Sequence, residues 1–147
     1  MTHRPSQAQP DKPTTYGAGA PSHHHGRTIA RLALAGFLGT AGIGHFTFAR
    51  KDFQAQVPDW VPLSKDATVL ASGVVELAMA AAIASGVKRK QVGRLAAAFF
   101  VGVFPGNLHQ YARHVDGLHL NTDARRLVRL FFQPVLVGWA LEATRKD

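Results

Sequence analysis

Four long apolar segments with very few charges limit what this chain can fold into more than any other feature. No Asp, Glu, Lys or Arg occurs from Leu32 to Phe48 or from Leu95 to Leu108. Between Ala67 and Gly86, Glu76 is the single charged residue. A helix that is apolar all round is deeply buried or lies in lipid, and 147 residues are too few to bury four such helices on every side. The sequence therefore predicts membrane helices at about residues 29–48, 67–86, 93–111 and 126–143.

A polar N-terminal tail precedes these segments. Residues 1–26 are rich in Pro, Ser, Thr, Gln and Gly and have almost no aliphatic side chains, which predicts disorder. The tail is not expected to be a signal peptide, because the apolar part starts too late and no small-residue cleavage pattern follows it. Its His23–His25 run is either a weak metal-binding site or a solvated cluster. The predicted fold is all-α, a four-transmembrane-helix bundle over residues 27–147 with a disordered N-terminal tail.

The charge balance is basic, with 17 Lys and Arg against 9 Asp and Glu, and the chain has no cysteine. The absence of cysteine excludes disulfides and thiolate metal ligands. A basic excess indicates nucleic acid or an anionic membrane surface as partner. Beside four membrane helices, we interpret it as contact with lipid headgroups and expect no nucleic-acid partner.

Four spans would place both chain termini on the same side of the membrane. Basic residues are almost evenly divided between the two sides, but the short connection Val87–Gly93 is densely basic. This favours cytoplasmic termini and a multi-pass protein of the inner (cytoplasmic) membrane. The first connection carries Trp60, an aromatic residue suited to the opposite membrane interface.

Each apolar segment contains one conspicuous polar residue at a similar depth. The rise of a helix places His45 about 5 Å and Asn107 about 6 Å from the ends that face the first and third connections. Gln133 lies about 10 Å and Glu76 about 14 Å from the same side of the bundle. Independent scatter would seldom give this, so we expect these four side chains to meet.

Arg129 belongs to the same group, because it lies one helical turn before Gln133 on the same face. A carboxylate in hydrocarbon has to be paired, neutral or in contact with a wet cavity. We expect Arg129 to be the partner of Glu76, with His45 as the second candidate. The predicted network is either polar glue for the bundle or a ligand, quinone or proton site. It consists of His45, Glu76, Asn107, Arg129 and Gln133.

Five short motifs follow one another along the apolar part of the chain. They are "GIGHF" (Gly42–Phe46), "VPDWVP" (Val57–Pro62), "SGVVEL" (Ser72–Leu77), "VFPGN" (Val103–Asn107) and "RLFFQ" (Arg129–Gln133). In this order and spacing the set resembles the DoxX-like family of small four-helix integral membrane proteins, and the resemblance covers roughly residues 29–139.

This resemblance implies a left-handed four-helix bundle in a bacterial cytoplasmic membrane. It also maps the polar positions of that family onto the same five residues of the predicted network. The chain departs from the family pattern at Gly106, where Ala is common, and at Phe131, where Pro is common. Neither departure removes a polar group.

The expected function is that of an accessory or anchoring subunit that binds a lipid or quinone in the polar pocket. The resemblance implies a link to redox or oxidative-stress systems and a membrane redox partner protein. The alternatives are a quinone-reactive subunit of a membrane oxidoreductase and a small transporter acting as a dimer, so a homo-oligomer is among the expected assemblies. Catalytic activity of the chain alone is uncertain, and no metal site is expected, since His109, His114 and His119 do not share a helix face.

Overall fold

The computed structural model describes residues 23–145, and within this range the chain is all-α with no strand. The predicted all-α class is therefore confirmed. Residues 1–22 of the predicted tail lie outside the described residues, whereas His23–Gly26 already belong to the first helix. The helices are α1 (His23–Phe46), α2 (Arg50–Gln54), α3 (Lys65–Ser85), α4 (Arg89–Ala112) and α5 (Asp123–Ala143).

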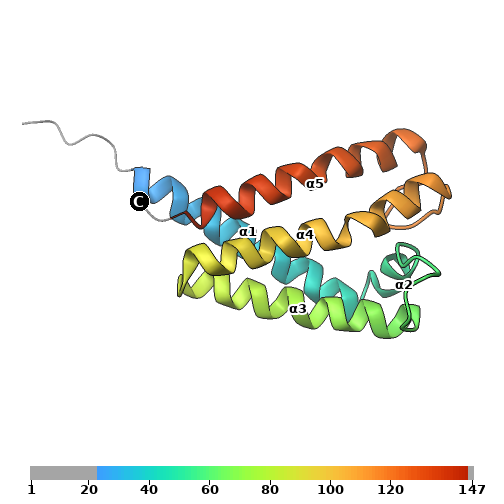
Figure 1. The fold of residues 1–147 in the computed structure, drawn as a ribbon, viewed down its shortest axis with the longest axis horizontal. Helices are drawn as coiled ribbons and strands as arrows, with labels where there is room; N and C mark the ends of the chain where they lie inside the picture. Colours follow the sequence, from blue (N-terminus) through green and yellow to red (C-terminus); the bar gives the residue numbers. More distant parts are fainter. Residues whose placement is uncertain (1–22, 146–147) are drawn as a thin grey trace, which may run out of the picture.

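The four long helices run lengthwise beside one another, and the short α2 lies at one end of them (Figure 1). The start of α1, the α3–α4 turn and the end of α5 lie together at the opposite end. Contacts are most extensive between α1 and α3 and between α4 and α5, and they are sparse between α3 and α4. The bundle thus consists of two tightly packed helix pairs that meet more loosely.

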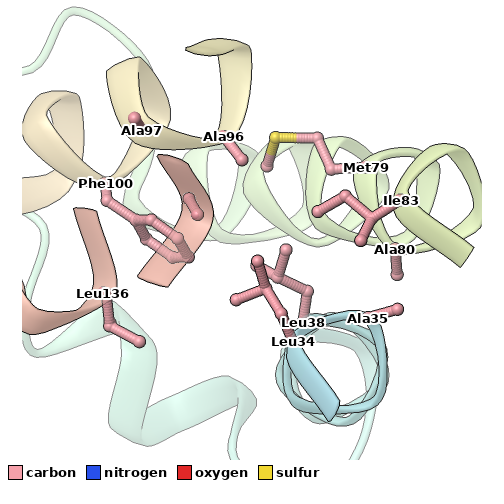
Figure 2. Packing of buried hydrophobic residues seen from close by; sticks show 11 residues of the cluster. Leu34, Ala35, Leu38, Met79, Ala80, Ile83, Ala96, Ala97, Phe100 and Leu136 are labelled. Atoms are coloured by element: carbon pink, nitrogen blue, oxygen red, sulfur yellow. The ribbon is translucent and has the colours of Figure 1, made fainter. Parts of the chain in front are cut away.

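An apolar core joins the two pairs in the half of the bundle nearer the chain termini (Figure 2). Leu34 and Leu38 of α1 and Ile83 of α3 are almost completely buried against Phe100 of α4 and Leu136 of α5. Burial of a leucine or isoleucine side chain of this kind stabilises a fold by about 1.5–3 kcal/mol. This half of the molecule is therefore held by ordinary hydrophobic packing.

Two glycines bring α1 and α3 into close contact near the other end. A methyl group at Gly73 would lie 2.7 Å from the Cβ atom of His45, and one at Gly42 would lie 2.8 Å from Leu77. Small residues of this kind allow two helix backbones to approach closely. Gly73 therefore sets the distance between α3 and the histidine on α1.

Local signals explain where the helices begin and end. Ser64 caps α3 by accepting a hydrogen bond from the backbone of Ala67, and Thr122 caps α5 in the same way. α3 ends at Gly86, whose φ of 70° is the left-handed conformation typical of a glycine helix stop. The buried Arg31 of α1 donates to the last carbonyl groups of α3.

Two helices are long and apolar enough to cross a membrane, judged by length and composition alone: residues His25–Phe46 and Lys65–Ser85. They belong to α1 and α3. Among the described helices, α4 and α5 do not reach this criterion, because polar residues interrupt their apolar runs. Both α4 and α5 continue through an internal proline.

Candidate functional site

A cavity of about 250 Å³ lies at the end of the bundle that carries α2. Its walls come from α1, α3, α4 and α5, with α2 and the connection to α3 beside them. Four of the five residues of the predicted network line it: His45, Glu76, Asn107 and Arg129. The fifth, Gln133, is buried just behind them and is bonded to two of them.

His45 and Glu76 form a pair on the α1–α3 side. The Nδ1 atom of His45 lies 2.9 Å from the backbone oxygen of Val69, and a carbonyl oxygen accepts hydrogen bonds only, so Nδ1 carries a proton. The other ring nitrogen, Nε2, lies 3.4 Å from the Oε2 atom of Glu76. The ring also stacks on Phe53 of α2, with centroids 3.7 Å apart. The histidine is thus fixed in orientation by a carbonyl group on one side and an aromatic ring on its face.

The Glu76 carboxylate is buried and incompletely bonded. The residue is 8% exposed, and its Oε2 atom has no hydrogen-bond partner among residues 23–145. An unsatisfied buried oxygen of this kind is costly, about 1–3 kcal/mol and more for a charged group. The structure therefore places an unsatisfied acceptor at the wall of a cavity.

The expected ion pair between Glu76 and Arg129 is absent from the part of the chain that the structure describes. The partner of Glu76 is His45, which was the second candidate from the sequence. Arg129 instead donates to the side-chain oxygen of Gln133, at 2.7 Å. The reason is local: Gln133 lies one turn along the same helix and offers an acceptor to the guanidinium group.

A second polar group occupies the α4–α5 side. The Oε1 atom of Gln133 accepts hydrogen bonds from Asn107 at 3.0 Å and from Arg129 at 2.7 Å. The Nε2 atom of Gln133 donates to the backbone oxygen of Phe100. Gln133 is therefore a positioning residue that directs Asn107 and Arg129 toward the cavity, and it satisfies its own polar atoms in doing so.

The connection between α2 and α3 covers one side of the cavity. Gln56, Val57, Pro58 and Val61 contribute to the lining. The backbone oxygen of Gln56 approaches α4 so closely that a methyl group at Gly106 would lie 2.8 Å from it. From the sequence, this connection was expected only to place Trp60 at the membrane interface. Its apolar, proline-containing run, residues 57–62, was the feature that indicated packing against the bundle.

Ion pairs hold this connection in place. Arg50 of α2 donates two hydrogen bonds to Asp66, at 2.8 and 2.6 Å. Lys65 lies 2.9 Å from Asp59, and its hydrogen bond holds the pKa of that exposed carboxyl below the usual range. Exposed pairs contribute little energy individually, but together they restrict where the connection lies.

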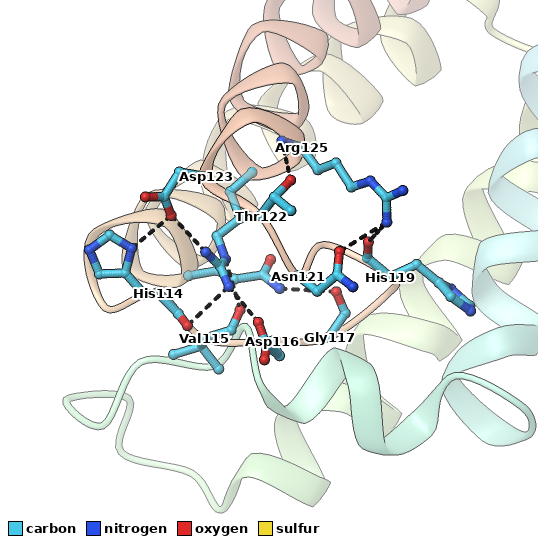
Figure 3. A network of polar contacts seen from close by, with 11 residues as sticks. His114, Val115, Asp116, Gly117, His119, Asn121, Thr122, Asp123 and Arg125 are labelled. Atoms are coloured by element: carbon cyan, nitrogen blue, oxygen red, sulfur yellow. Dashed lines mark hydrogen bonds and ion pairs between the residues drawn. The ribbon is translucent and has the colours of Figure 1, made fainter.

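A separate polar cluster organises the loop between α4 and α5 (Figure 3). The buried Arg126 donates to Asp123, Asp116 and the backbone oxygens of His114 and Val115. His114 also contacts Asp123 at 2.7 Å. Hydrogen bonds from His114 and then from Arg126 lower the pKa of the Asp123 carboxyl. The structural role of Arg126 was not predicted from the sequence, although its place one turn after the capping Thr122 indicated it.

The histidines whose surroundings the structure describes lie apart from one another along the chain. No group of three or more His, Cys, Asp or Glu side chains suited to a metal ion occurs among the described residues. His114 is engaged with Asp123, and the backbone oxygen of His119 accepts a hydrogen bond from Arg125. The side chains of His23 and His24 lie outside what the structure describes.

Comparison with known proteins gives one match. The family model described as "Domain of unknown function (DUF8561)" matches residues 34–144. No curated protein and no solved structure matches the chain. The matched segment contains all five helices except the first turns of α1. It also includes all five residues of the predicted network.

Proposed function

The chain belongs to the DUF8561 family, and we propose that it is an integral membrane protein that binds a lipid or quinone in the cavity between its helices. In this proposal the four long helices span the membrane as a bundle. The protein serves as an accessory or anchoring subunit, without catalytic activity of its own. The single observation that carries the proposal is that polar side chains are buried inside the bundle while large apolar side chains cover its surface, the inverse of a soluble protein.

This inversion is visible on every long helix. The polar residues His45, Glu76, Asn107, Gln110 and Gln133 are buried. Large apolar side chains of the same helices are exposed instead. They include Ile29, Leu32 and Ile43 of α1, Val74 and Val75 of α3, Leu95, Val101 and Leu108 of α4, and Val128, Phe131 and Val135 of α5. A soluble bundle has the opposite arrangement, so lipid is the environment that best suits this surface.

The same inversion bears on α4 and α5, whose average hydropathy is reduced by polar residues. Those polar residues include Asn107, Gln110, Arg126 and Gln133, and all four are buried. Between residues 95 and 108 of α4 and between residues 130 and 141 of α5, every exposed residue is apolar, and the exposed charged residues of both helices lie nearer their ends. This supports four spans rather than the two that length and composition alone identify.

The two ends of the bundle differ in a way that supports an orientation. Lys88, Arg89 and Lys90 are exposed at the α3–α4 turn, near the start of α1 and the end of α5. Trp60 is 71% exposed at the opposite end. A short basic loop favours the cytoplasmic side, so we propose cytoplasmic termini and an inner-membrane location.

The ligand class follows from the cavity and from the resemblance to DoxX-like proteins. The cavity combines apolar walls, which include Val57, Pro58 and Val61, with a carboxylate and a guanidinium group. Sites for small amphiphiles combine apolar walls with a few polar groups in this way. The resemblance adds the expectation of a bacterial membrane and of a redox or stress-response partner protein.

A second candidate function is that of a quinone-reactive subunit. It is favoured by the His45–Glu76 pair, in which one proton can reside on either Nε2 or the carboxylate while Nδ1 stays protonated. Such a pair could exchange one proton with a ligand in the cavity. A membrane oxidoreductase partner would have to supply the electrons.

The experiment that tests the proposal is fractionation of cells followed by purification in mild detergent. We expect the protein in the membrane fraction, and mass spectrometry of the purified sample should detect a co-purifying lipid or quinone. Recovery in the soluble fraction would contradict the membrane proposal. A membrane protein without any bound small molecule would contradict the binding proposal.

The chain offers a matched pair of variants for this experiment. Gly102 lines the cavity, and a methyl group there would meet no atom within 4 Å. Gly36 of α1 is equally free of neighbours and does not line the cavity. Gly102→Leu should abolish co-purification of the ligand, whereas Gly36→Leu should retain it.

A further inference from the structure

Two buried polar atoms at the cavity wall have no hydrogen-bond partner among the described residues: Oε2 of Glu76, an acceptor, and Nε2 of Gln56, a donor. His45 Nε2 lies 3.4 Å from Oε2 of Glu76, too distant for a good hydrogen bond. A group that donates a hydrogen bond would complete this acceptor. A ligand with acceptors alone, such as a ketone or an ether, would leave it unsatisfied.

Arg129, on the α5 side of the cavity, requires a hydrogen-bond acceptor instead. Arg129 has five N–H donors, and within residues 23–145 its side chain donates one hydrogen bond, to Gln133. Arg129 and Glu76 both line the cavity and lie close enough to attract one another electrostatically without forming a direct ion pair, so a ligand in the cavity can contact both. A carboxylate or phosphate ligand would suit Arg129 but be repelled by Glu76, and an ammonium ligand would have the reverse difficulty.

A neutral hydroxyl group can form hydrogen bonds with both Glu76 and Arg129. It donates one hydrogen bond and accepts others through a single oxygen atom. It can therefore donate to Glu76 and accept from Arg129 without introducing charge into a partly buried site. Its oxygen atom needs little room, so the remaining space is left for the apolar part of the ligand.

The side of the cavity between α3 and α4 leaves room for that apolar part. These two helices make sparse contacts with each other. Thr68 and Ser72 of α3 and Gly102 and Val103 of α4 line the cavity, and Gly102 is exposed with open space where a side chain would project. In the four-span arrangement proposed above, the exposed faces of α3 and α4 lie against lipid.

We propose that the cavity selects a neutral amphiphile whose hydroxyl group lies between Glu76 and Arg129 and whose apolar part leaves between α3 and α4. This inference rests on the proposed ligand-binding function and narrows its ligand to hydroxylated compounds. Within the quinone class, the reduced hydroquinone is preferred over the oxidised quinone. A long-chain alcohol lipid offers the same chemistry from another source.

The test compares ligands that share a skeleton. A decyl-substituted hydroquinone, its dimethyl ether and its quinone are titrated under anaerobic conditions into the full-length protein in nanodiscs, and affinities are measured by calorimetry. We expect the hydroquinone to bind at least about tenfold more tightly than the ether or the quinone, because only the hydroquinone donates to the carboxylate. Decan-1-ol is the fourth probe, and its binding would support the inference and identify an alcohol lipid as sufficient.

Two matched variant pairs localise the effect. Glu76→Gln supplies its own amide donor and should reduce the preference for the hydroquinone to less than about threefold. Glu142→Gln, a change of the same kind at an exposed residue near the end of α5, should leave it unchanged. Gly102→Leu should abolish binding of every probe, and Gly36→Leu should bind as the wild type does.

The failures of the two proposals are distinguishable. Equal affinity for the hydroquinone, the ether and the quinone would overturn hydroxyl selection and leave ligand binding intact. Tighter binding of the quinone would have the same meaning. If a membrane-inserted protein binds none of the four probes, hydroxyl selection is overturned, and the ligand-binding function fails as well if nothing co-purifies from cells.

Discussion

Two clusters of buried charge lie at the same end of the bundle, and they are built differently. Every side-chain nitrogen of Arg126 has an acceptor in the loop between α4 and α5. In the cavity cluster, by contrast, the Oε2 atom of Glu76 has no hydrogen-bond partner within residues 23–145. The Arg126 cluster fixes the conformation of the loop between α4 and α5. The cavity cluster leaves a hydrogen-bond acceptor of Glu76 unpaired at the cavity wall.

The difference separates a structural role from a binding role. A fully bonded buried ion stabilises the conformation around it, and removal of one partner is expensive. An incompletely bonded ion costs stability, which folded proteins tolerate chiefly where a ligand or a reaction requires it. The predictions below test this distinction, from the largest expected effect to the smallest.

Arg126→Leu should cause the largest loss. It removes the donor shared by Asp116, Asp123 and two backbone oxygens. Because the two carboxylates are themselves largely exposed, we expect a decrease of about 2–3 kcal/mol in the free energy of unfolding, chiefly from the lost hydrogen bonds. Denaturant titration in detergent, followed by circular dichroism, measures this. The exposed neighbour Arg125 is the matched control, and Arg125→Leu should cost less than about 1 kcal/mol. Equal costs for the two changes would contradict the structural role of Arg126.

Gly73→Ala should have the next largest effect. The added methyl group would meet the Cβ atom of His45 and the ring of Phe46, both at 2.7 Å, so α1 and α3 have to separate. Overpacking of this kind costs about 1–3 kcal/mol. Gly36→Ala adds the same methyl group where nothing lies within 4 Å and should stabilise the protein by up to about 1 kcal/mol. A stabilising Gly73→Ala would show that the helices do not approach so closely.

Glu76→Gln should raise stability slightly. The change removes an incompletely bonded carboxylate and keeps the volume of the side chain, and we expect a gain of about 1 kcal/mol in the ligand-free protein. The same denaturant titration measures it. A loss of more than about 2 kcal/mol would mean that a partner holds the carboxylate in the folded state, and the contrast with Arg126 would disappear.

Asp123→Asn should give the smallest effect, and the effect should depend on pH. Hydrogen bonds from His114 and Arg126 lower the pKa of Asp123 in the folded state. A carboxyl with a lowered pKa stabilises the fold above its unfolded pKa of about 4 and loses this contribution as the pH falls through the folded pKa. The difference between variant and wild type should therefore be largest at neutral pH and shrink in acid. A difference that grows in acid would contradict this assignment.

Much of the site could be predicted from the sequence, because the rise per residue of a helix gives the depth of each residue along the bundle. The rise per residue was enough to place His45, Glu76 and Asn107 toward the same end of the bundle, and these residues do line one cavity. The same reasoning found the long helices, since each apolar run is long and bounded by polar residues. The length of an apolar run and the spacing of its polar residues can be read directly from a sequence.

The pairing within the site was not accessible in this way. Glu76 was expected to meet Arg129, but side-chain rotamers and the loose contact between the helix pairs decide which charges touch. The ring of His45 was within reach because Gly73 brings α1 close to α3. The short helix α2, with Phe53 stacked on His45, was also missed, since five residues show no periodicity.

The division of the bundle into two helix pairs has a consequence for the order in which the site is assembled. Each pair joins long helices that follow one another along the chain, and such local contacts form before distant ones. The pairs are tied together by contacts between remote segments, such as the hydrogen bond from Trp139 to Ala30, 109 residues apart. Glu76 belongs to the α1–α3 pair and Arg129 to the α4–α5 pair, so the cavity forms only when the two pairs dock. A folding intermediate with both pairs formed but undocked would thus have a complete set of long helices and no binding site.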